Sequence, residues 1–198
     1  MGLFHKITFI PRFIRQVFFL PFNKLMFKSA GACIGRNFSV RNRFYLKLYP
    51  NGTLTIGNDF TVHSGEAINP ITRNIKGCFF INGGGSLTIG NNVGMSSPTI
   101  WCDEKIVIGN DVRIGALVTI MDTDCHSLNY KDRMNGDKGT KTKPVVIEEG
   151  VLIGAQSIVL KGSHIGAHSV IGAGSVVCGE IPANCIAAGN PCKVIRKL

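Results

Sequence analysis

The sequence has little of several things on which many folds and sites depend. Its 198 residues, enough for one domain with a core, contain a single tryptophan but 24 glycines. That balance argues against a globule packed around aromatic side chains and is expected of a repetitive solenoid. The seven cysteines are odd in number and form no Cys-x-x-Cys, which argues against a disulfide framework and a thiolate zinc site. We expect most of them to be small buried side chains in a reducing compartment.

Acidic side chains are also scarce. The chain has only 12 Asp and Glu residues but 22 Lys and Arg residues, which gives a formal net charge of +10. Such a chain attracts anions: phosphates, acidic glycans, nucleic acid or an anionic membrane. The sequence has no helix-turn-helix, zinc-finger or RNA-binding signature, and much of the charge lies at the two ends and in one loop. We therefore expect no nucleic-acid partner.

Long uninterrupted hydrophobic runs are missing too, even from the phenylalanine-rich residues 1–28, which are too interrupted by charge to span a bilayer. Arg12 and Arg15 also break the apolar core that a signal peptide needs. Apolar residues recur there at helical spacing, at Ile10, Phe13, Ile14, Val17 and Phe18. We expect Pro11 and Pro21 to bound this helical piece. Two interpretations stay open. The segment is a helix that caps the first coil of a solenoid, or a basic amphipathic segment on an anionic membrane surface.

What the sequence does contain is a period of six. One aliphatic residue, usually followed by glycine or another small residue, recurs at Ile108, Ile114 and Ile120, and again at Ile147, Ile153, Val159, Ile165, Ile171 and Val177. This period fits neither an α-helix nor a simple alternating strand. It fits short flat strands joined by tight turns, the hexapeptide class of parallel β-helix. We expect the aliphatic residues to stack inside, and each glycine to turn the corner by adopting positive φ.

The repeat divides the chain into three parts: the N-terminal segment, residues 29–181 and a tail at 182–198. Within the repeat the period breaks at 121–144, which begins with an Asp-Thr-Asp-Cys-His run at 122–126 and continues as a polar stretch. An excursion from a rigid solenoid is where function is usually found. We expect an all-β fold with a protruding loop that carries the chemistry.

The hexads, the loop histidine and the tail together resemble the hexapeptide-repeat acyltransferases, in particular the maltose, galactoside and nodulation O-acetyltransferases and the acetyltransferases of exopolysaccharide clusters. The most specific element is Gly189-Asn190-Pro191 followed by Val194-Ile195-Arg196. The resemblance covers residues 86–198 well and the first third of the chain loosely. It implies a left-handed parallel β-helix, a homotrimer with active sites between chains, and acetyl-CoA as the acyl donor.

Direct acyl transfer from a thioester to a hydroxyl needs a base, an oxyanion donor and an aligned acyl donor, but no covalent intermediate. The resemblance implies that His126 is the base, since it stands where family members carry their catalytic histidine. Imidazole suits this role because its pKa of about 6.5 leaves it mostly neutral at pH 7. The alternative is that His126 is an ordinary histidine of a surface loop. The family reads His-Pro-Leu-Asp, with an arginine seven residues after the histidine. Here the motif is His126-Ser127-Leu128-Asn129 and Arg133 keeps the spacing, so we count Arg133 among the substrate-binding candidates.

The residues around the histidine have open roles. Asp122 and Asp124 are candidates to orient the imidazole, as a carboxylate does in a catalytic triad, and solvation of a polar loop explains each of them equally well. Direct transfer does not need Cys125 as a nucleophile.

The resemblance also implies where acetyl-CoA binds. Alignment of the hexads puts Ala155 where a backbone N–H meets the thioester carbonyl, and Ala173 where the backbone meets the pantetheine arm. Lys193 and Arg196 match basic residues that reach the nucleotide phosphates, a role that suits fixed cations; a solvated basic tail is the alternative. The chain departs from the family at Cys178-Gly179, where relatives often have Thr-Lys near the adenine.

Two further predictions concern the acceptor and metals. Ser96 lies where several sugar acetyltransferases have an asparagine that touches the acceptor, so it is our substrate-binding candidate. His164 and His168 raise a metal alternative, because related solenoids include a zinc carbonic anhydrase. No partner pair stands in the register which that site needs, so we expect no metal.

The sequence therefore predicts an acetyl-CoA-dependent O-acetyltransferase that acts directly on a sugar hydroxyl, in a surface polysaccharide or its lipid-linked precursor. We expect it to be cytoplasmic, with a peripheral contact at the inner membrane surface. An N-acetyltransferase of an amino sugar nucleotide is the alternative enzyme. A non-catalytic binding solenoid is the alternative from another class.

Overall fold

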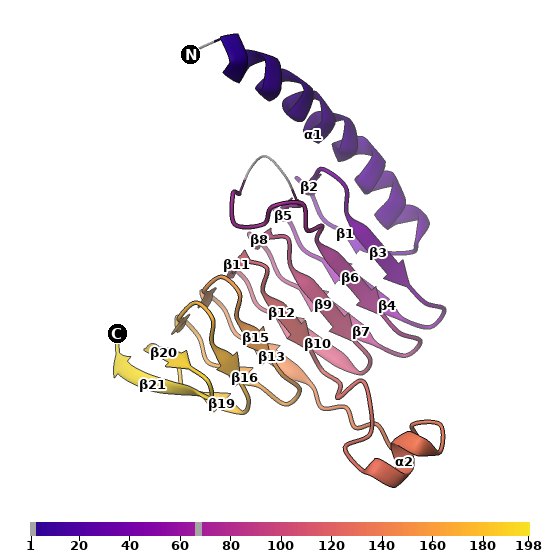
Figure 1. Cartoon of the computed structure of the whole chain (residues 1–198), viewed down its shortest axis with the longest axis vertical. Helices are drawn as coiled ribbons and strands as arrows, with labels where there is room; N and C mark the ends of the chain where they lie inside the picture. Colours follow the sequence, from indigo (N-terminus) through magenta and orange to yellow (C-terminus); the bar gives the residue numbers. More distant parts are fainter. Residues whose placement is uncertain (1–2, 66–68) are drawn as a thin grey trace.

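The computed structural model describes residues 3–65 and 69–198. It is a three-sided parallel β-helix with a long helix across its N-terminal end and a loop that projects from its side between β12 (Thr119–Met121) and β13 (Val145–Ile147) (Figure 1). The predicted all-β fold, a left-handed parallel β-helix with a helical N-terminal segment and a protruding loop, is confirmed.

Each side of the prism is a parallel sheet, and successive strands enter sheets A, B and C in turn. Sheet A contains β1 (Cys33–Ile34), β4 (Thr53–Ile56), β7 (Ser86–Ile89), β10 (Lys105–Ile108), β13 (Val145–Ile147), β16 (His164–Ile165) and β19 (Glu180–Ile181). Sheet B contains β2 (Ser39–Arg41), β5 (Thr61–His63), β8 (Gly94–Ser96), β11 (Arg113–Ala116), β14 (Leu152–Ile153), β17 (Val170–Ile171) and β20 (Cys185–Gly189), and ends with antiparallel β21 (Cys192–Lys197). Sheet C contains β3 (Tyr45–Leu48), β6 (Cys78–Ile81), β9 (Thr99–Cys102), β12 (Thr119–Met121), β15 (Ile158–Val159) and β18 (Val176–Val177).

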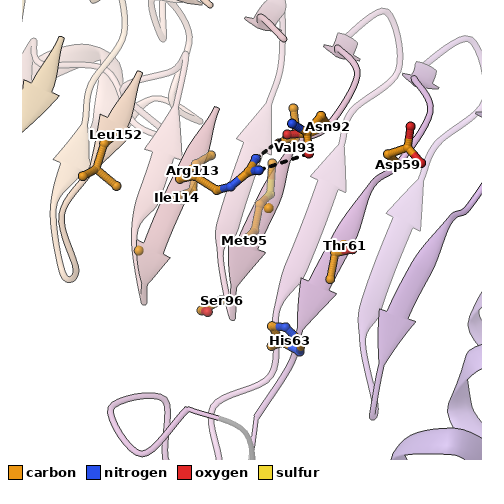
Figure 2. A pocket seen from close by; sticks show the side chains of 12 residues that line it. Asp59, Thr61, His63, Asn92, Val93, Met95, Ser96, Arg113, Ile114 and Leu152 are labelled. Atoms are coloured by element: carbon orange, nitrogen blue, oxygen red, sulfur yellow. Dashed lines mark hydrogen bonds between the residues drawn. The ribbon is translucent and has the colours of Figure 1, made fainter. Parts of the chain in front are cut away.

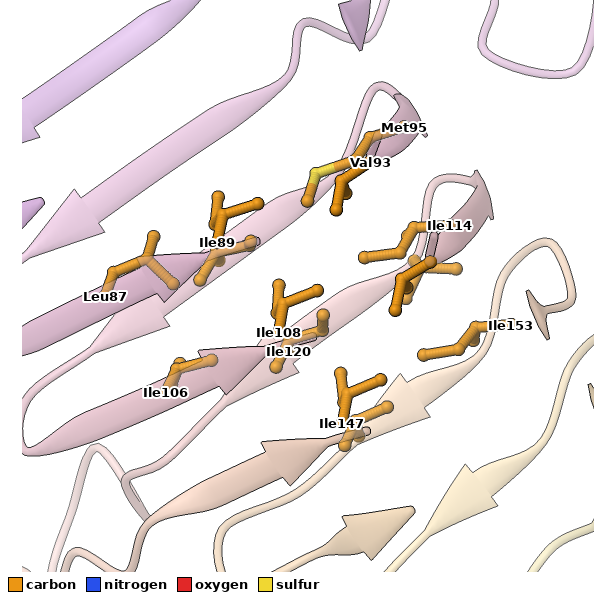
Figure 3. Close-up of a cluster of buried hydrophobic side chains, with 14 of the residues drawn as sticks. Leu87, Ile89, Val93, Met95, Ile106, Ile108, Ile114, Ile120, Ile147 and Ile153 are labelled. Atoms are coloured by element: carbon orange, nitrogen blue, oxygen red, sulfur yellow. The ribbon is translucent and has the colours of Figure 1, made fainter. Parts of the chain in front are cut away.

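The core is a column of aliphatic side chains in register from coil to coil (Figure 3). In sheet A, Ile108 pairs with Ile147 and Ile147 with Ile165, and all three are buried. Ile114 and Ile153 stack in the same way in sheet B. Burial of each such side chain contributes roughly 1.5–3 kcal/mol relative to leaving it in water. The predicted inward stacking of the hexad residues is confirmed.

The glycine after each aliphatic residue has a different role from the one expected. Positive φ falls two residues later, for example at Asn92 after Gly90 and at Gln156 after Gly154. What glycine allows is close approach of stacked corners, because a Cβ on Gly154 would lie only 2.4 Å from the backbone nitrogen of Ala173. The expectation that these glycines turn the corner through positive φ was therefore wrong.

Helix α1 (Leu3–Ser29) covers the open first coil and packs on β1 and β2. Phe27 is fully buried against the rings of Phe38 and Phe44, at centroid distances of 5.0 and 5.6 Å. The buried amide of Asn23 donates from Nδ2 to the carbonyl oxygen of Val40 at 2.8 Å. Since the first coil has no preceding coil to cover it, these contacts shield its core and satisfy its backbone.

The helix is longer than the sequence predicted. Pro11 and Pro21 were expected to bound it, yet it runs through both. A proline removes one backbone hydrogen bond but leaves room for helix on either side, and the anchored Asn23 and Phe27 hold the turns after Pro21. Residues 1–2 and the side chains of residues 12 and 13, for which the sequence made predictions, lie outside what the structure describes. In the part of the chain that the structure describes, no helix is long and apolar enough to cross a membrane.

The close approach at the corners gives a stability prediction. We expect Gly154→Ala to lower the free energy of unfolding by roughly 1–3 kcal/mol, because the added carbon overlaps backbone that cannot move away. Gly94→Ala is the matched control, since the atoms nearest to its Cβ would belong to the exposed side chain of Arg113, at 3.3 Å and beyond. Thermal unfolding measures both variants. Equal melting temperatures would contradict the steric role of Gly154.

Candidate active site

The loop that breaks the hexapeptide period leaves the prism at the corner between sheets C and A, after β12 and before β13. The outgoing and returning segments of the loop are joined at its base. There Thr123 forms an isolated antiparallel bridge with Thr142, and the Asp124 N–H donates to the carbonyl oxygen of Lys141 at 3.0 Å. Farther out it contains the short helix α2 (Tyr130–Met134). A backbone held in this way presents its side chains in fixed positions.

His126 lies on this loop with its side chain 73% exposed. Its Nδ1 is hydrogen-bonded to Oδ2 of Asp137. This contact and the Ser127 N–H lower the pKa of Asp137, so the carboxyl group is ionised and acts only as an acceptor. Nδ1 of His126 must then be the donor, so the neutral form of the ring carries its lone pair on Nε2. An imidazole in this tautomer is ready to accept a proton at Nε2.

The residues next to the histidine hold this pair in place. The Ser127 N–H donates to Oδ1 of Asp137 at 2.7 Å, and Arg133 Nη1 donates to the carbonyl oxygen of Ser127 at 2.7 Å. Helix α2 brings Arg133 back beside the histidine, which gives the seven-residue spacing a physical reason. In this chain Arg133, a substrate-binding candidate from the sequence, thus binds the loop backbone.

The two aspartates proposed to orient the imidazole have other partners. Asp122 is fully buried, and its carboxylate accepts three backbone N–H groups of residues 103–105 at 2.7–2.9 Å. Asp124 Oδ2 lies 3.3 Å from Nζ of Lys161. We therefore replace both by Asp137 as the partner of His126. Sequence reasoning missed Asp137 because it stands 11 residues away, at a distance that only the folded loop closes.

The thiol of Cys125 is not prepared for nucleophilic attack. Burial raises its pKa, and the carboxylates of Asp103 and Asp124 raise it further. Because the thiolate is the reactive form, the position next to His126 carries a protonated thiol at neutral pH.

The residues predicted to contact acetyl-CoA lie at a different corner, between sheets B and C. Ala155 and Ala173 occupy equivalent turns of adjacent coils, after β14 and β17. Lys193 and Arg196 are exposed on β21, next to β20 at the end of sheet B. Because the coils stack, the two alanines lie one above the other, and the line through them continues toward the C-terminal tail. The structure does not bring His126 and Ala155 to the same corner of one chain.

A groove on sheet B approaches this second corner (Figure 2). Ser96 lies there, directly in register with His63 of the preceding coil. Burial, with a smaller effect of Arg41, lowers the pKa of His63, so its ring is neutral at physiological pH. Its Nδ1 is buried without a hydrogen-bond partner among the described residues. Arg113, at the other end of the groove, donates from Nη2 to Oδ1 of Asn92 at 3.0 Å. The sequence analysis did not predict His63. Aligning the coils would have placed it beside Ser96, with which it is in register.

The histidines that raised a metal alternative are paired with carboxylates. His164 Nε2 lies 2.7 Å from Oε1 of Glu148, and His168 Nε2 lies 3.9 Å from Oε1 of Glu149. Residues 3–65 and 69–198 contain no group of three side chains arranged to hold a metal ion.

Comparison with known proteins identifies the class. The family model of bacterial transferase hexapeptides (six repeats) matches residues 144–179. A candidate acetyltransferase of Saccharomyces cerevisiae is 35% identical over 164 residues, which cover 80% of this chain and 82% of that protein. A candidate O-acetyl transferase of lipopolysaccharide biosynthesis from Escherichia coli is 30% identical over 161 residues, 78% of this chain and 77% of that protein.

A solved structure of a galactoside acetyltransferase in complex with coenzyme A superposes with a TM-score of 0.57 and 29% identity, covering 88% of this chain and 68% of that one. The chain belongs to the hexapeptide-repeat acetyltransferases. It is therefore an enzyme, and the predicted family and acyltransferase class are confirmed.

The protonated state of Cys125 predicts that its thiol is dispensable. We expect Cys125→Ser to keep most of the acetyl-transfer activity, because serine preserves the size of the side chain and a protonated thiol is a poor nucleophile. Transfer of labelled acetyl from acetyl-CoA measures this without thiol reagents. Loss of transfer in a variant with unchanged thermal stability would show that the thiol takes part.

Proposed function

We propose that this acetyltransferase moves the acetyl group of acetyl-CoA to a sugar hydroxyl, in a surface polysaccharide or its lipid-linked precursor, in the cytoplasm. The observation that carries the proposal is the exposed imidazole of His126, held at Nδ1 by an ionised carboxylate and oriented to take a proton at Nε2. The names of relatives that acetylate galactosides or take part in lipopolysaccharide biosynthesis support the acceptor class.

The proposed reaction is a direct transfer. Nε2 of His126 takes the proton of the acceptor hydroxyl while its oxygen attacks the thioester carbonyl carbon. The carbon–sulfur bond then breaks, and the imidazolium returns the proton to the leaving CoA thiolate. Asp137 stabilises the imidazolium between these steps. The backbone N–H of Ala155 stabilises the charge that develops on the carbonyl oxygen.

We place this site between two chains of a homotrimer. His126 projects from the corner of sheets C and A, whereas Ala155 and Ala173 lie at the corner of sheets B and C. A neighbouring chain is needed to bring such corners together, and threefold symmetry repeats the arrangement three times. Leu152 and Ile158, on either side of Ala155, are 44% and 38% exposed in the single chain. Their burial between chains suits an interface.

The acceptor has a matching groove. Ser96 offers a hydroxyl that can exchange hydrogen bonds with sugar hydroxyls, and the neutral ring of His63 lines the groove beside it. We place acetyl-CoA, the acyl donor, along the coils that follow. Its pantetheine arm lies along Ala155 and Ala173, and its nucleotide phosphates contact Lys193 and Arg196.

Substitutions in the loop test the base. We expect His126→Ala to lower kcat by roughly 10²- to 10⁴-fold, and Asp137→Asn by at least about tenfold, because the amide no longer stabilises the imidazolium. Asp132→Asn is the matched control, in the same loop but not paired with the histidine. The assay is transfer of labelled acetyl to sugars, oligosaccharides, sugar nucleotides and amino sugar nucleotides. Full activity of His126→Ala would refute the base, and transfer confined to amino groups would replace O-acetylation by N-acetylation.

Mixed trimers test the division of the site between chains. We expect His126→Ala and Ala173→Glu each to be inactive alone, the second because a side chain obstructs the path of the pantetheine arm. Randomly mixed trimers of the two should regain roughly a quarter of wild-type activity, since some sites combine an intact loop with an intact corner. Light scattering should give three times the chain mass of 21.4 kDa. Mixtures without activity, or an active monomer, would contradict the shared site.

A further inference from the structure

The positive charge of this protein is concentrated at one end of the chain. Residues 1–58 contain nine Lys and Arg and no Asp or Glu, whereas residues 59–198 contain the other 13 cations and all 12 acidic residues. Almost the whole net charge of +10 therefore belongs to helix α1 and the first coils. Figure 1 shows that these elements form one end of the molecule. Such an end attracts a negatively charged surface.

The outer face of α1 is apolar as well. Residues that are 47–67% exposed recur at i, i+4, i+7, i+8, i+12 and i+15 along the helix, namely Ile10, Ile14, Val17, Phe18, Phe22 and Leu25. At 3.6 residues per turn they share an arc of roughly 140°. The buried Gln16, Asn23 and Phe27 lie on the opposite side, against the solenoid. The apolar stripe, which we call the α1 outer face, therefore points away from the protein.

Cations border this apolar face. Lys24 and Lys28 are exposed beside it on the helix. Between α1 and the first coil a groove has aromatic walls, including Phe19 and Phe22, and contains Arg43 and Lys76. The guanidinium of Arg43 lies 5.8 Å from the ring centre of Phe19. An apolar stripe bordered by cations and aromatic rings is the pattern of helices that lie in a membrane interface.

We propose that the α1 outer face and the cations around it dock this protein onto an anionic lipid bilayer. The helix lies on the surface, since no described helix is long and apolar enough to cross it, and its anchoring through Asn23 and Phe27 fixes the solenoid relative to the lipid. Charge complementarity selects anionic lipid, and the stripe adds burial among headgroups and acyl chains. This inference goes beyond the proposed function and does not depend on it.

Vesicle co-sedimentation of the full chain tests the docking. We expect binding to vesicles of phosphatidylcholine with phosphatidylglycerol that is at least about tenfold tighter than to pure phosphatidylcholine, and that weakens as salt is added. Lys24→Glu with Lys28→Glu should weaken it at least about tenfold, and so should Ile14→Glu with Phe18→Glu. Lys131→Glu and Met134→Glu on α2 are matched controls, which should bind like the wild type.

Several outcomes would overturn the proposal. They are equal binding to neutral and anionic vesicles, α1 variants that bind as tightly as the wild type, and α2 variants that lose binding to the same extent. A change of oligomeric mass in Ile14→Glu with Phe18→Glu would show that the α1 outer face contacts another copy instead. Because the substituted side chains are exposed, unfolding temperatures should not change. Acetyl transfer by the same variants to a soluble saccharide keeps this test separate from that of the proposed function.

Discussion

The close stacking of equivalent corners is the constraint on which the rest of this structure depends. Strands of neighbouring coils lie about 4.8 Å apart, and a Cβ on Gly154 would already meet the backbone of the next coil. Inside the prism, aliphatic side chains fill the space in register from coil to coil. Because the interior is apolar and the corners are tight, the polar chemistry lies on the outside, in excursions and along the edges.

That constraint also separates the two groups of residues in the proposed site. The loop with His126 and Asp137 leaves at one corner, while Ala155 and Ala173 repeat at another. A rigid prism cannot fold one corner onto the next, so in the trimer that we propose a neighbouring chain supplies the other part. The ends of the stack need their own solutions, which are the buried face of α1 at the start and antiparallel β21 at the finish.

The sequence predicted most of the fold and located the loop of the candidate site. The period of six is a direct record of which residues point inward, so Ile147, Ile153 and their equivalents were placed correctly. The sequence did not show why glycine is needed after each aliphatic residue. The reason is the short distance between the corners of neighbouring coils, which residues far apart in the sequence determine together. The break in the period located His126, but its partner depends on how the loop folds back, and so Asp137 was missed in favour of Asp122 and Asp124.

The most direct test of the account is a crystal structure of the full chain with bound CoA. We predict a trimer in which the pantetheine arm lies along Ala155 and Ala173 of one chain, with its sulfur facing His126 of the next. A CoA bound to the histidine and the alanines of a single chain, or far from any His126, would contradict the shared site.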